Sequence, residues 1–235
     1  MNEALILFSG GKDSFLSTLI MLDKGYKVNL VTFDNGCELK SKNVLIGAKR
    51  IQKKYGIDKV NIIGMKKTDA IFRELICKFY NYDLEYINKQ FGKITISQFN
   101  CLACRLSMYI LSIIICKQGN IKLVVDGARK CQMFAIEQDK MIKEFEQLFQ
   151  NFDLEISFPL LYETDDFSIK NKILAHGFIP KMNEVQCLLG MPILNHPIDE
   201  EIINGCFNIY RKELFPKVED ILKRYETIKF TGDYL

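Results

Sequence analysis

The fold of this chain follows from one stretch near its start, Glu3-Ala4-Leu5-Ile6-Leu7-Phe8-Ser9-Gly10-Gly11-Lys12-Asp13-Ser14. The run from Leu5 to Phe8 is continuously apolar, which is typical of a parallel strand buried on both faces. Two glycines then give the backbone the freedom for a tight turn, and Ser14 opens a helix with an apolar face. Free N–H groups and the positive end of the helix dipole make such a junction an anion site. The stretch therefore predicts a site for a polyphosphate.

The order of residues in this loop distinguishes it from two common phosphate-binding loops. Asp13 stands between Lys12 and Ser14, so the Gly-x4-Gly-Lys-Ser/Thr order of a Walker A loop is absent. The third glycine of a dinucleotide-binding Gly-x-Gly-x-x-Gly pattern is absent as well. A glycine turn that merely enters a helix is the remaining alternative to a ligand site.

The stretch from Ser9 to Ser14 resembles the PP-loop of the ATP pyrophosphatase superfamily, Ser-Gly-Gly-x-Asp-Ser, at every fixed position. The resemblance implies that ATP is cleaved between its α and β phosphates in the presence of Mg²⁺. AMP is placed on a substrate oxygen, and pyrophosphate stays in the loop. The residues that it implies in ATP binding are Ser9, Gly10, Gly11, Lys12, Asp13 and Ser14, with Lys12 and Asp13 also acting in catalysis.

Composition is that of an ordinary globular protein. The chain has 235 residues, of which 48% are hydrophobic and 26% charged, so one domain with an appendage is expected. We see no apolar run that approaches the roughly 20 residues of a membrane span, and no signal peptide precedes the first strand. We therefore expect a cytoplasmic protein with no membrane contact. The net charge of +3 neither requires nor excludes a nucleic-acid partner.

Strand-like and helix-like segments alternate along the chain, which predicts a parallel sheet with helices on both faces. We expect an α/β, Rossmann-like fold of about five strands, divided into a PP-loop domain at 1–190 and a helical C-terminal extension at 191–235 that packs on it. The segment 81–99 gives no clear pattern. After the first strand, the expected strands are 26–33, 59–65, 121–125 and 154–158, and the expected helices are 43–55, 68–79, 104–117, 165–176 and 199–225.

The second expected strand ends in Phe33-Asp34-Asn35-Gly36. Ligands of such sheets bind outside the carboxyl ends of the strands, so Phe33 and the backbone around it should border the adenine. Asp34 is placed to reach ribose hydroxyls or a metal. An Asx turn is an equally good interpretation of Asp34.

The fourth expected strand ends in Asp126-Gly127-Ala128-Arg129. PP-loop enzymes often carry Gly-His-Asn-x-x-Asp-Asp-Gln at this point, and Gly127 and Gln132 fit that pattern. The histidine and the acidic pair are absent. Asp126 and Arg129 are therefore the candidates for the missing contacts, including a second contact to magnesium, and a solvated loop is the alternative.

The sequence Cys101-Leu102-Ala103-Cys104 is a C-x2-C pair that we expect at the start of a helix. Two such sulfurs can share a metal or a cluster or form a redox pair, and the helix N-terminus should lower the pKa of both thiols. A second C-x2-C pair is absent, but Cys187 follows in a loop. A buried pair without chemistry is the alternative, and Cys77 and Cys116 are expected in the core and Cys206 in packing.

Together with the PP-loop, Cys101-x-x-Cys104-Arg105, the segment Phe158-Pro159-Leu160 and Cys187 resemble the tRNA 2-thiocytidine synthetase family. The resemblance implies a 4Fe–4S cluster on Cys101, Cys104 and Cys187, with one iron open to hold a sulfur atom. An open coordination position is where a substrate can bind. The family's run of arginines after the cysteine pair is replaced here by Arg105-Leu106-Ser107, which argues for a smaller acceptor.

Three classes of function remain from the sequence. The first, which is the one we expect, is an ATP-dependent sulfurtransferase that adenylates a carbonyl oxygen of a nucleobase, in tRNA or in a small molecule. It replaces this oxygen with sulfur held on the 4Fe–4S cluster, and the sulfur comes from a donor such as sulfide or a cysteine desulfurase. The second is a PP-loop ligase or synthase acting on a small molecule, with zinc or a redox cysteine pair. The third is a non-catalytic nucleotide and cluster sensor. A homodimer is open in each class.

Overall fold

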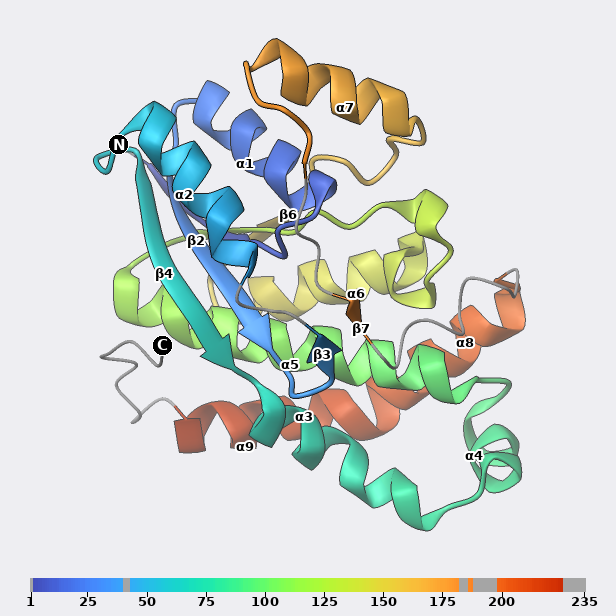
Figure 1. Ribbon diagram of the computed structural model, residues 1–235. Helices are drawn as coiled ribbons and strands as arrows, with labels where there is room; N and C mark the ends of the chain where they lie inside the picture. Colours follow the sequence, from blue (N-terminus) through green and yellow to red (C-terminus); the bar gives the residue numbers. More distant parts are fainter. Residues whose placement is uncertain (1, 40–42, 182–185, 188–197, 226–235) are drawn as a thin grey trace.

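A five-stranded parallel sheet forms the centre of the computed structural model (Figure 1), which describes all residues except 1, 40–42, 182–185, 188–197 and 226–235. The strand order is β4-β2-β1-β5-β6, and every neighbouring pair in it is parallel. The expected α/β fold with a parallel sheet of five strands is confirmed. The strands are β1 (Glu3–Leu7), β2 (Lys27–Asp34), β4 (Val60–Lys67), β5 (Leu123–Val125) and β6 (Glu155–Ser157).

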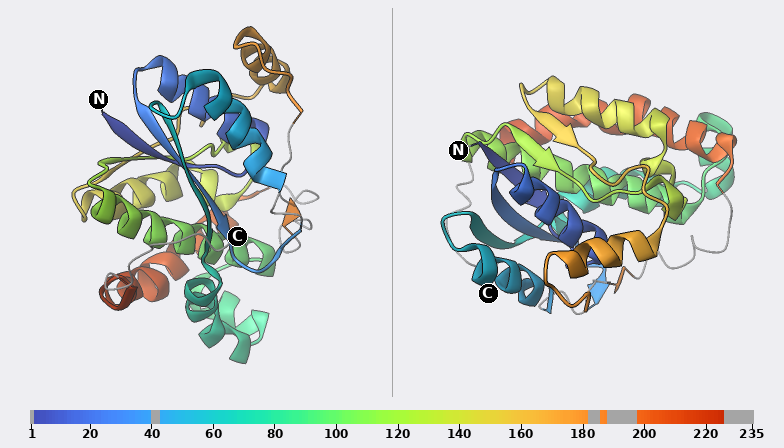
Figure 2. Two further views of the ribbon diagram at one scale, coloured as in Figure 1. Left: turned by 60° about the vertical axis from the view of Figure 1, so that its left-hand side comes forward. Right: turned by 90° about the horizontal axis from the view of Figure 1, so that it is seen from above.

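Helices cover both faces of this sheet (Figures 1 and 2). β1 lies in the middle and is buried on both sides, as its apolar run predicts, because Ala4 and Ile6 pack into one core and Leu5 and Leu7 into the other. The first face carries α1 (Lys12–Asp23), α2 (Val44–Tyr55) and α7 (Asp166–Ala175). The second face carries α3 (Asp69–Ile76), α5 (Ile96–Gly119), α6 (Asp139–Gln150), α8 (Glu200–Ile209) and α9 (Phe215–Tyr225).

Short elements connect these layers. The helix α4 (Leu84–Phe91) lies in the segment for which the sequence gives no clear pattern. An antiparallel pair, β3 (Glu38–Leu39) and β7 (Gln186–Cys187), sets Glu38 opposite Cys187. Three 3₁₀ turns and one π turn complete the described elements, and they are η2 (Cys77–Asn81), η3 (Lys130–Gln132), η4 (Ala135–Glu137) and η6 (Tyr210–Leu214).

The helix expected from residue 104 begins eight residues earlier, at Ile96. Thr95 is its N-cap, and the Thr95 hydroxyl accepts a hydrogen bond of 3.2 Å from the amide of Gln98. The C-x2-C pair therefore lies within α5, in its second and third turns, and the expectation that it starts a helix is wrong. The helix α6 is missing from the expectation altogether, although its apolar residues recur at helical spacing.

The length and apolar composition of α5 would allow it to cross a membrane, contrary to our expectation that no segment comes near this. Of its most apolar window, however, 78% is buried inside the protein, where α5 packs against α3, α8 and α9. A core helix passes the same test, so this one helix is weak support for a membrane span.

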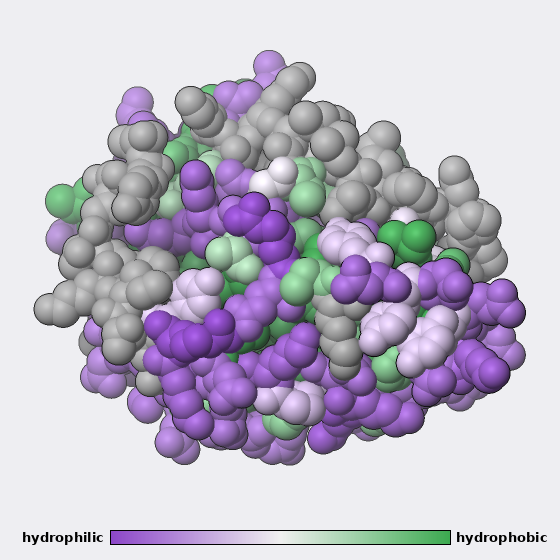
Figure 3. All heavy atoms as spheres, turned by 90° about the horizontal axis from the view of Figure 1, so that it is seen from below, coloured by the Kyte–Doolittle hydropathy of each residue, from purple (hydrophilic) through white to green (hydrophobic). Residues whose placement is uncertain are grey.

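The C-terminal helices join the core of the second face rather than projecting from it. Cys206 and Tyr210 are fully buried in the same cluster as α5. Gly205 allows the close approach of α8 to the preceding chain, because a Cβ at this position would stand 2.1 Å from the carbonyl oxygen of Lys93. Among the described residues on the face that Figure 3 shows, hydrophilic ones predominate. The division at residue 190 stays a prediction.

Candidate active site

A cavity of about 320 Å³ lies at the carboxyl ends of β1, β2 and β5. In the strand order β4-β2-β1-β5-β6, the chain runs from β1 to β2 and β4 on one side and then to β5 and β6 on the other side. The order therefore reverses between β1 and β5, and ligands of such sheets bind at this switch point. The cavity joins the glycine loop to one side of α5 and to the three candidate cysteines. The predicted site residues among those that line it are Ser9, Gly11, Asp13, Ser14, Phe33, Cys101, Cys104, Asp126, Gly127 and Cys187.

The glycine loop has a geometry that fits a phosphate group. Gly10 has a φ of 76°, a left-handed conformation that glycine adopts without strain. The hydroxyls of Ser9 and Ser14 are 3.2 Å apart, and the amide of Gly11 donates to Ser9 Oγ at 3.3 Å. In the described part of the chain, no side chain caps the N-terminus of α1. Its first amides are therefore available to an anion.

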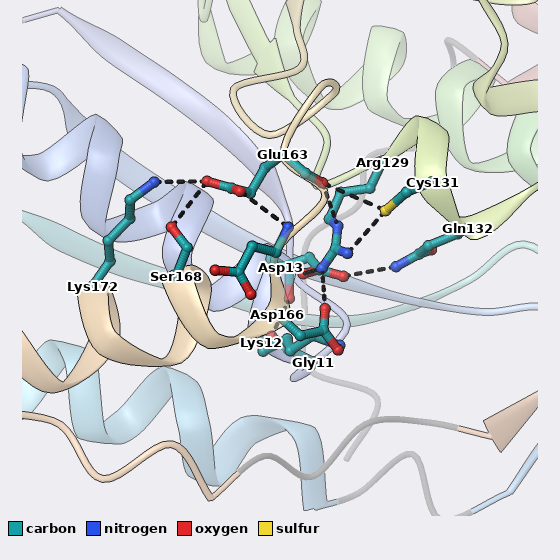
Figure 4. A network of polar contacts seen from close by, with 12 residues as sticks. Gly11, Lys12, Asp13, Arg129, Cys131, Gln132, Glu163, Asp166, Ser168 and Lys172 are labelled. Carbon is teal, nitrogen blue, oxygen red and sulfur yellow. Dashed lines mark hydrogen bonds and ion pairs between the residues drawn. The ribbon is translucent and has the colours of Figure 1, made fainter.

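Behind the loop, Arg129 ties the start of α1 to α7 (Figure 4). Its guanidinium donates to Asp13 Oδ1 at 3.1 Å and to Asp166 Oδ1 at 2.7 Å. Gln132 Nε2 donates to the second oxygen of Asp13 at 2.8 Å. Lys12 lies 3.4 Å from Asp166 and is partly exposed. Burial lowers the pKa of Arg129, but its hydrogen bonds to Asp166 and Cys131 and the nearby charge of Asp13 raise the pKa by more than burial lowers it. The guanidinium therefore stays charged.

Arg129 and Asp126 are both buried, whereas residues of a solvated loop would be exposed. Arg129 is 4% exposed and Asp126 is 3% exposed, so that alternative is wrong for both residues. Arg129 itself is not among the residues that line the cavity. The contacts around Asp13 make Arg129 a residue that positions the loop, and the sequence did not distinguish this from direct contact with a ligand.

Gly127 brings the loop after β5 against the glycine loop. A Cβ at this position would stand 2.9 Å from the amide nitrogen of Ser14 and 3.0 Å from the carbonyl carbon of Asp13. These neighbours are backbone atoms at the N-terminus of α1 and cannot give way cheaply. Glycine is therefore required for the two loops to meet.

Asp126 anchors a buried polar group on the opposite side of the cavity. Its Oδ2 accepts from Tyr109 at 2.7 Å and forms a close ion pair with Arg105. Arg105 also reaches Glu137 Oε1 at 3.5 Å. Burial raises the pKa of Glu137 to about 8, against the opposing effect of the Arg105 charge. The other oxygen of Asp126, Oδ1, accepts a hydrogen bond of 3.1 Å from the amide of Ala128, so both oxygens of Asp126 already have protein partners.

Phe33 lines the cavity as expected for the adenine side, but Asp34 does not. The Oδ1 atom of Asp34 accepts a hydrogen bond of 2.8 Å from the amide of Gly36, so the Asx turn is formed. Its neighbour Asn35 reaches the site instead, and its amide nitrogen lies 2.9 Å from Cys104 Sγ. Sequence reasoning missed Asn35, although its place in an Asp-Asn-Gly turn at a strand end was the available signal.

The structure brings Cys101, Cys104 and Cys187 to one cavity, although 83 residues separate the last two. Pairing of β7 with β3 at the end of β2 accounts for the position of Cys187. Burial, followed by the proximity of Cys187, raises the pKa of Cys101 to about 12. The expected lowering of this pKa is therefore wrong, because burial of the Cys101 thiol outweighs the opposing effect of the nearby Arg105 charge.

The cysteines do not form a ready metal site. Among the described residues, no three His, Cys, Asp or Glu side chains are grouped so that they could hold a metal ion. Thiols are the right donor type for an iron–sulfur cluster, but their arrangement does not fit one. Of the other cysteines, Cys116 and Cys206 are buried as expected, whereas Cys77 is exposed because α3 ends at Ile76 and a 3₁₀ turn follows.

The sequence model of a family described as "Queuosine biosynthesis protein QueC" matches residues 3–106, which is less than half of the chain. The matched part includes the glycine loop and the C-x2-C pair. No curated protein matches the chain by sequence.

Among solved structures, a 4-thiouridine synthetase in complex with RNA and bound ATP is 14% identical, with a TM-score of 0.63. The alignment covers 96% of this chain and 53% of that one, so the chain spans about half the length of that structure. An NMN synthetase from Francisella tularensis is 10% identical over 99% of this chain and 90% of that one, with a TM-score of 0.47. A predicted subunit of a tRNA methyltransferase from Methanocaldococcus jannaschii is 15% identical over 80% and 97%, with a TM-score of 0.48. The 4-thiouridine synthetase structure shows the same fold as this chain, an α/β fold built on a parallel sheet.

Proposed function

We propose that this chain is an AMP-forming ATP pyrophosphatase that adenylates an oxygen of a small, nucleobase-like molecule. The observation that carries the proposal is one cavity that has the uncapped N-terminus of α1 on one wall and polar side chains of α5 on the other. Cavities of a few hundred cubic ångströms are typical of small-molecule sites. The matched family, which is named for queuosine biosynthesis, also supports a nucleobase-like substrate.

We call the side of the cavity formed by the glycine loop and the N-terminus of α1 the loop wall, and the side that faces it across the cavity the α5 wall. The residues of the loop wall would bind the phosphates. The amides at the start of α1 and the hydroxyls of Ser9 and Ser14 bind the β and γ phosphates, with Mg²⁺ neutralising their charge. The side chain of Lys12 is partly exposed, so it can rotate away from Asp166 and bind a phosphate oxygen. Asp13 keeps the loop in place through its contacts with Arg129 and Gln132.

The reaction that follows from this placement is a displacement at the α phosphorus. An oxygen of the substrate forms a bond to the α phosphorus. The bond between the α phosphorus and the oxygen that bridges it to the β phosphate breaks, and the pyrophosphate that is released stays in the loop. The substrate then carries AMP on its oxygen, which makes that oxygen a good leaving group for a second nucleophile.

The products of nucleotide turnover test this function. Purified protein with Mg²⁺ and ATP should yield AMP and pyrophosphate, separated by ion-exchange chromatography, and release of ADP and orthophosphate would sink the proposal. Lys12→Ala should slow turnover or weaken nucleotide binding by about ten-fold or more, since a charge-assisted contact contributes about 1.5–3 kcal/mol. Lys59→Ala, at an exposed position outside the cavity, is the matched control.

Sulfur transfer is a second candidate, supported by the three cysteines on the cavity wall and by the likeness to a 4-thiouridine synthetase. In this form the substrate is a nucleobase of tRNA or a small molecule, and sulfide or a cysteine desulfurase supplies the sulfur. The cysteine side chains would have to come closer together to hold a 4Fe–4S cluster, so we derive no step through a cluster.

Iron and sulfide analysis of anaerobically purified protein separates the two candidates. A cluster-bearing protein carries about four irons and four sulfides and loses them in Cys101→Ala, Cys104→Ala and Cys187→Ala. The buried Cys116→Ala and Cys206→Ala variants are the controls and should keep them. Stoichiometric zinc without iron, together with an unchanged thionucleoside profile in the tRNA of a host that lacks the gene, would remove tRNA thiolation.

A further inference from the structure

The carboxylate of Asp166 lies between two cations beside the glycine loop (Figure 4). Asp166 Oδ1 accepts a hydrogen bond of 2.7 Å from Arg129, and Oδ2 lies 3.4 Å from the ammonium nitrogen of Lys12. Gly11 and Asp13, the neighbours of Lys12 in the chain, both line the cavity, but Lys12 does not. The ion pair with Asp166 therefore keeps the ammonium group of Lys12 beside the cavity rather than in it.

The fold fixes the position of Asp166. Asp166 begins α7, and Ile169 and Ile173 of that helix are fully buried in the core that α1 also joins. The hydrogen bond from Arg129 and the charge of Lys12 lower the pKa of Asp166, so the carboxylate is ionised at neutral pH. An anion of the protein itself thus occupies two cations next to a loop that fits a phosphate group.

The neighbouring Asp165 shows what Asp166 would do if it served α7 alone. An acidic residue in the first turn of a helix stabilises that helix through its dipole. Asp165 is the N-cap of α7, and its carboxylate accepts a hydrogen bond of 2.8 Å from the amide of Phe167. Within the described residues, Lys12 and Arg129 form their ion pairs with other carboxylates and not with Asp165. Two carboxylates at the same helix end therefore differ in their contact with these cations.

We propose that Asp166 is a positioning residue that competes with phosphate for Lys12 and so limits how tightly pyrophosphate is held. The proposal rests on the function proposed above and adds a residue that acts on the release of its product. A carboxylate oxygen and a phosphate oxygen make the same kind of charge-assisted contact with an ammonium group. Lys12 must leave Asp166 to reach a phosphate in the cavity, and Asp166 takes the ammonium group back as pyrophosphate departs.

Binding of pyrophosphate with Mg²⁺ to the full chain tests the competition. Calorimetric titrations are made at about 0.15 M salt, where charges are screened over about 8 Å. Asp166→Asn should bind pyrophosphate about three- to five-fold more tightly than the wild type, the gain expected from removing a partly exposed ion pair. Asp165→Asn is the matched control, since it removes the same charge one residue away and keeps an N-cap side chain, and its affinity should change by less than about 1.5-fold.

A double variant shows whether the gain acts through Lys12. Lys12→Ala alone should weaken pyrophosphate binding, and adding Asp166→Asn to it should change the affinity by less than about 1.5-fold, because the two residues act as a pair. In steady-state assays, Asp166→Asn should lower the KM for ATP and increase inhibition by added pyrophosphate. Loss of a purely structural contact would not tighten the binding of either molecule. Thermal unfolding curves establish that each variant is folded.

The outcomes separate this inference from the function on which it rests. Failure of the wild type to bind α,β-methylene-ATP with Mg²⁺ would overturn the proposed function itself. If the wild type binds this analogue, three results would overturn the role of Asp166 alone: equal or weaker pyrophosphate binding in Asp166→Asn, an equal gain in Asp165→Asn, or an equal gain from Asp166→Asn when Lys12 is already replaced by alanine.

Discussion

The two walls of the cavity differ in how their polar side chains are satisfied. On the loop wall, both carboxylate oxygens of Asp13 accept hydrogen bonds, from Arg129 and from Gln132. On the α5 wall, Asn100 and Glu137 each keep one oxygen without a partner among the described residues. The loop wall is therefore built before the ligand arrives, as electrostatic stabilisation of phosphate requires. The α5 wall, in contrast, keeps two buried oxygens unsatisfied within the described residues.

Removal of Arg129, the cation at the centre of the loop wall, should cause the largest loss of stability. Arg129→Met leaves the buried Asp13 without its charge partner and frees Asp166, so we expect the free energy of unfolding to fall by about 3–5 kcal/mol in urea titrations. The control is Arg73→Met, whose exposed ion pair with Asp69 is worth only about 0.3–0.5 kcal/mol. A loss below about 1 kcal/mol for Arg129→Met would show that the loop does not depend on this arginine.

A smaller loss should follow when the loop wall is displaced rather than unpaired. Gly127→Ala places a methyl group 2.9 Å from the Ser14 amide, and the backbone must shift to admit it. A misplacement of about 1 Å near reacting groups costs on the order of 100-fold in rate, and we expect AMP formation to fall by that factor. Gly119→Ala, where the added atom would meet only the flexible side chain of Ile121 at 3.4 Å, should leave the rate unchanged. Equal rates in the two variants would contradict the close approach.

Sequence reasoning reached the loop wall and much of the sheet because the signals there are local. The apolar run from Leu5 to Phe8 and the glycines after it specify strand, turn and helix within twelve residues, and all five expected strands were found within a few residues of their bounds. Gly127 was identified because it matches one position of a known pattern at a strand end. The reason that glycine is needed there, contact with the backbone at Ser14, is a tertiary fact.

The α5 wall could not be predicted because its composition arises from contacts distant in sequence. Glu137 lies in η4, a short 3₁₀ turn with no periodic pattern. Arg105 of α5 forms ion pairs with Glu137 and with Asp126, which follows β5, so this group combines residues from three parts of the chain. The start of α5 was misplaced because Thr95 was not recognised as an N-cap. The raised pKa of Cys101 was missed because it comes from burial, which depends on tertiary packing. Asn100 carried no signal, since one asparagine in a helix says nothing of an unsatisfied oxygen.

Within the α5 wall, the hydrogen bond between Tyr109 and Asp126 is a satisfied contact whose loss can be compared with the loop wall. Tyr109→Phe removes a buried donor 2.7 Å from Asp126 Oδ2, while the ion pair with Arg105 remains. We expect the free energy of unfolding to fall by about 1.5–3 kcal/mol, the range for a hydrogen bond to a charged group. Tyr162→Phe, which loses a 3.1 Å bond to Asp139 at the exposed surface, should stay within about 0.5 kcal/mol of the wild type in the same titration.

The two walls should also respond to pH in opposite directions. Burial raises the pKa of Glu137 from 4.5 to about 8, so between these values the folded protein binds a proton that the unfolded chain has lost. The contribution of Glu137 to stability is therefore complete below pH 4.5 and is lost as the pH rises to about 8, with a slope of at most about 1.4 kcal/mol per pH unit. Asp166 on the loop wall has its pKa lowered by the hydrogen bond from Arg129, so its contribution is present above pH 3.8 and is lost only as the pH falls further. Urea titrations between pH 5 and pH 8 should show the falling slope in the wild type and a flatter one in Glu137→Gln, and equal slopes would mean that the carboxyl group of Glu137 is not held protonated by its burial.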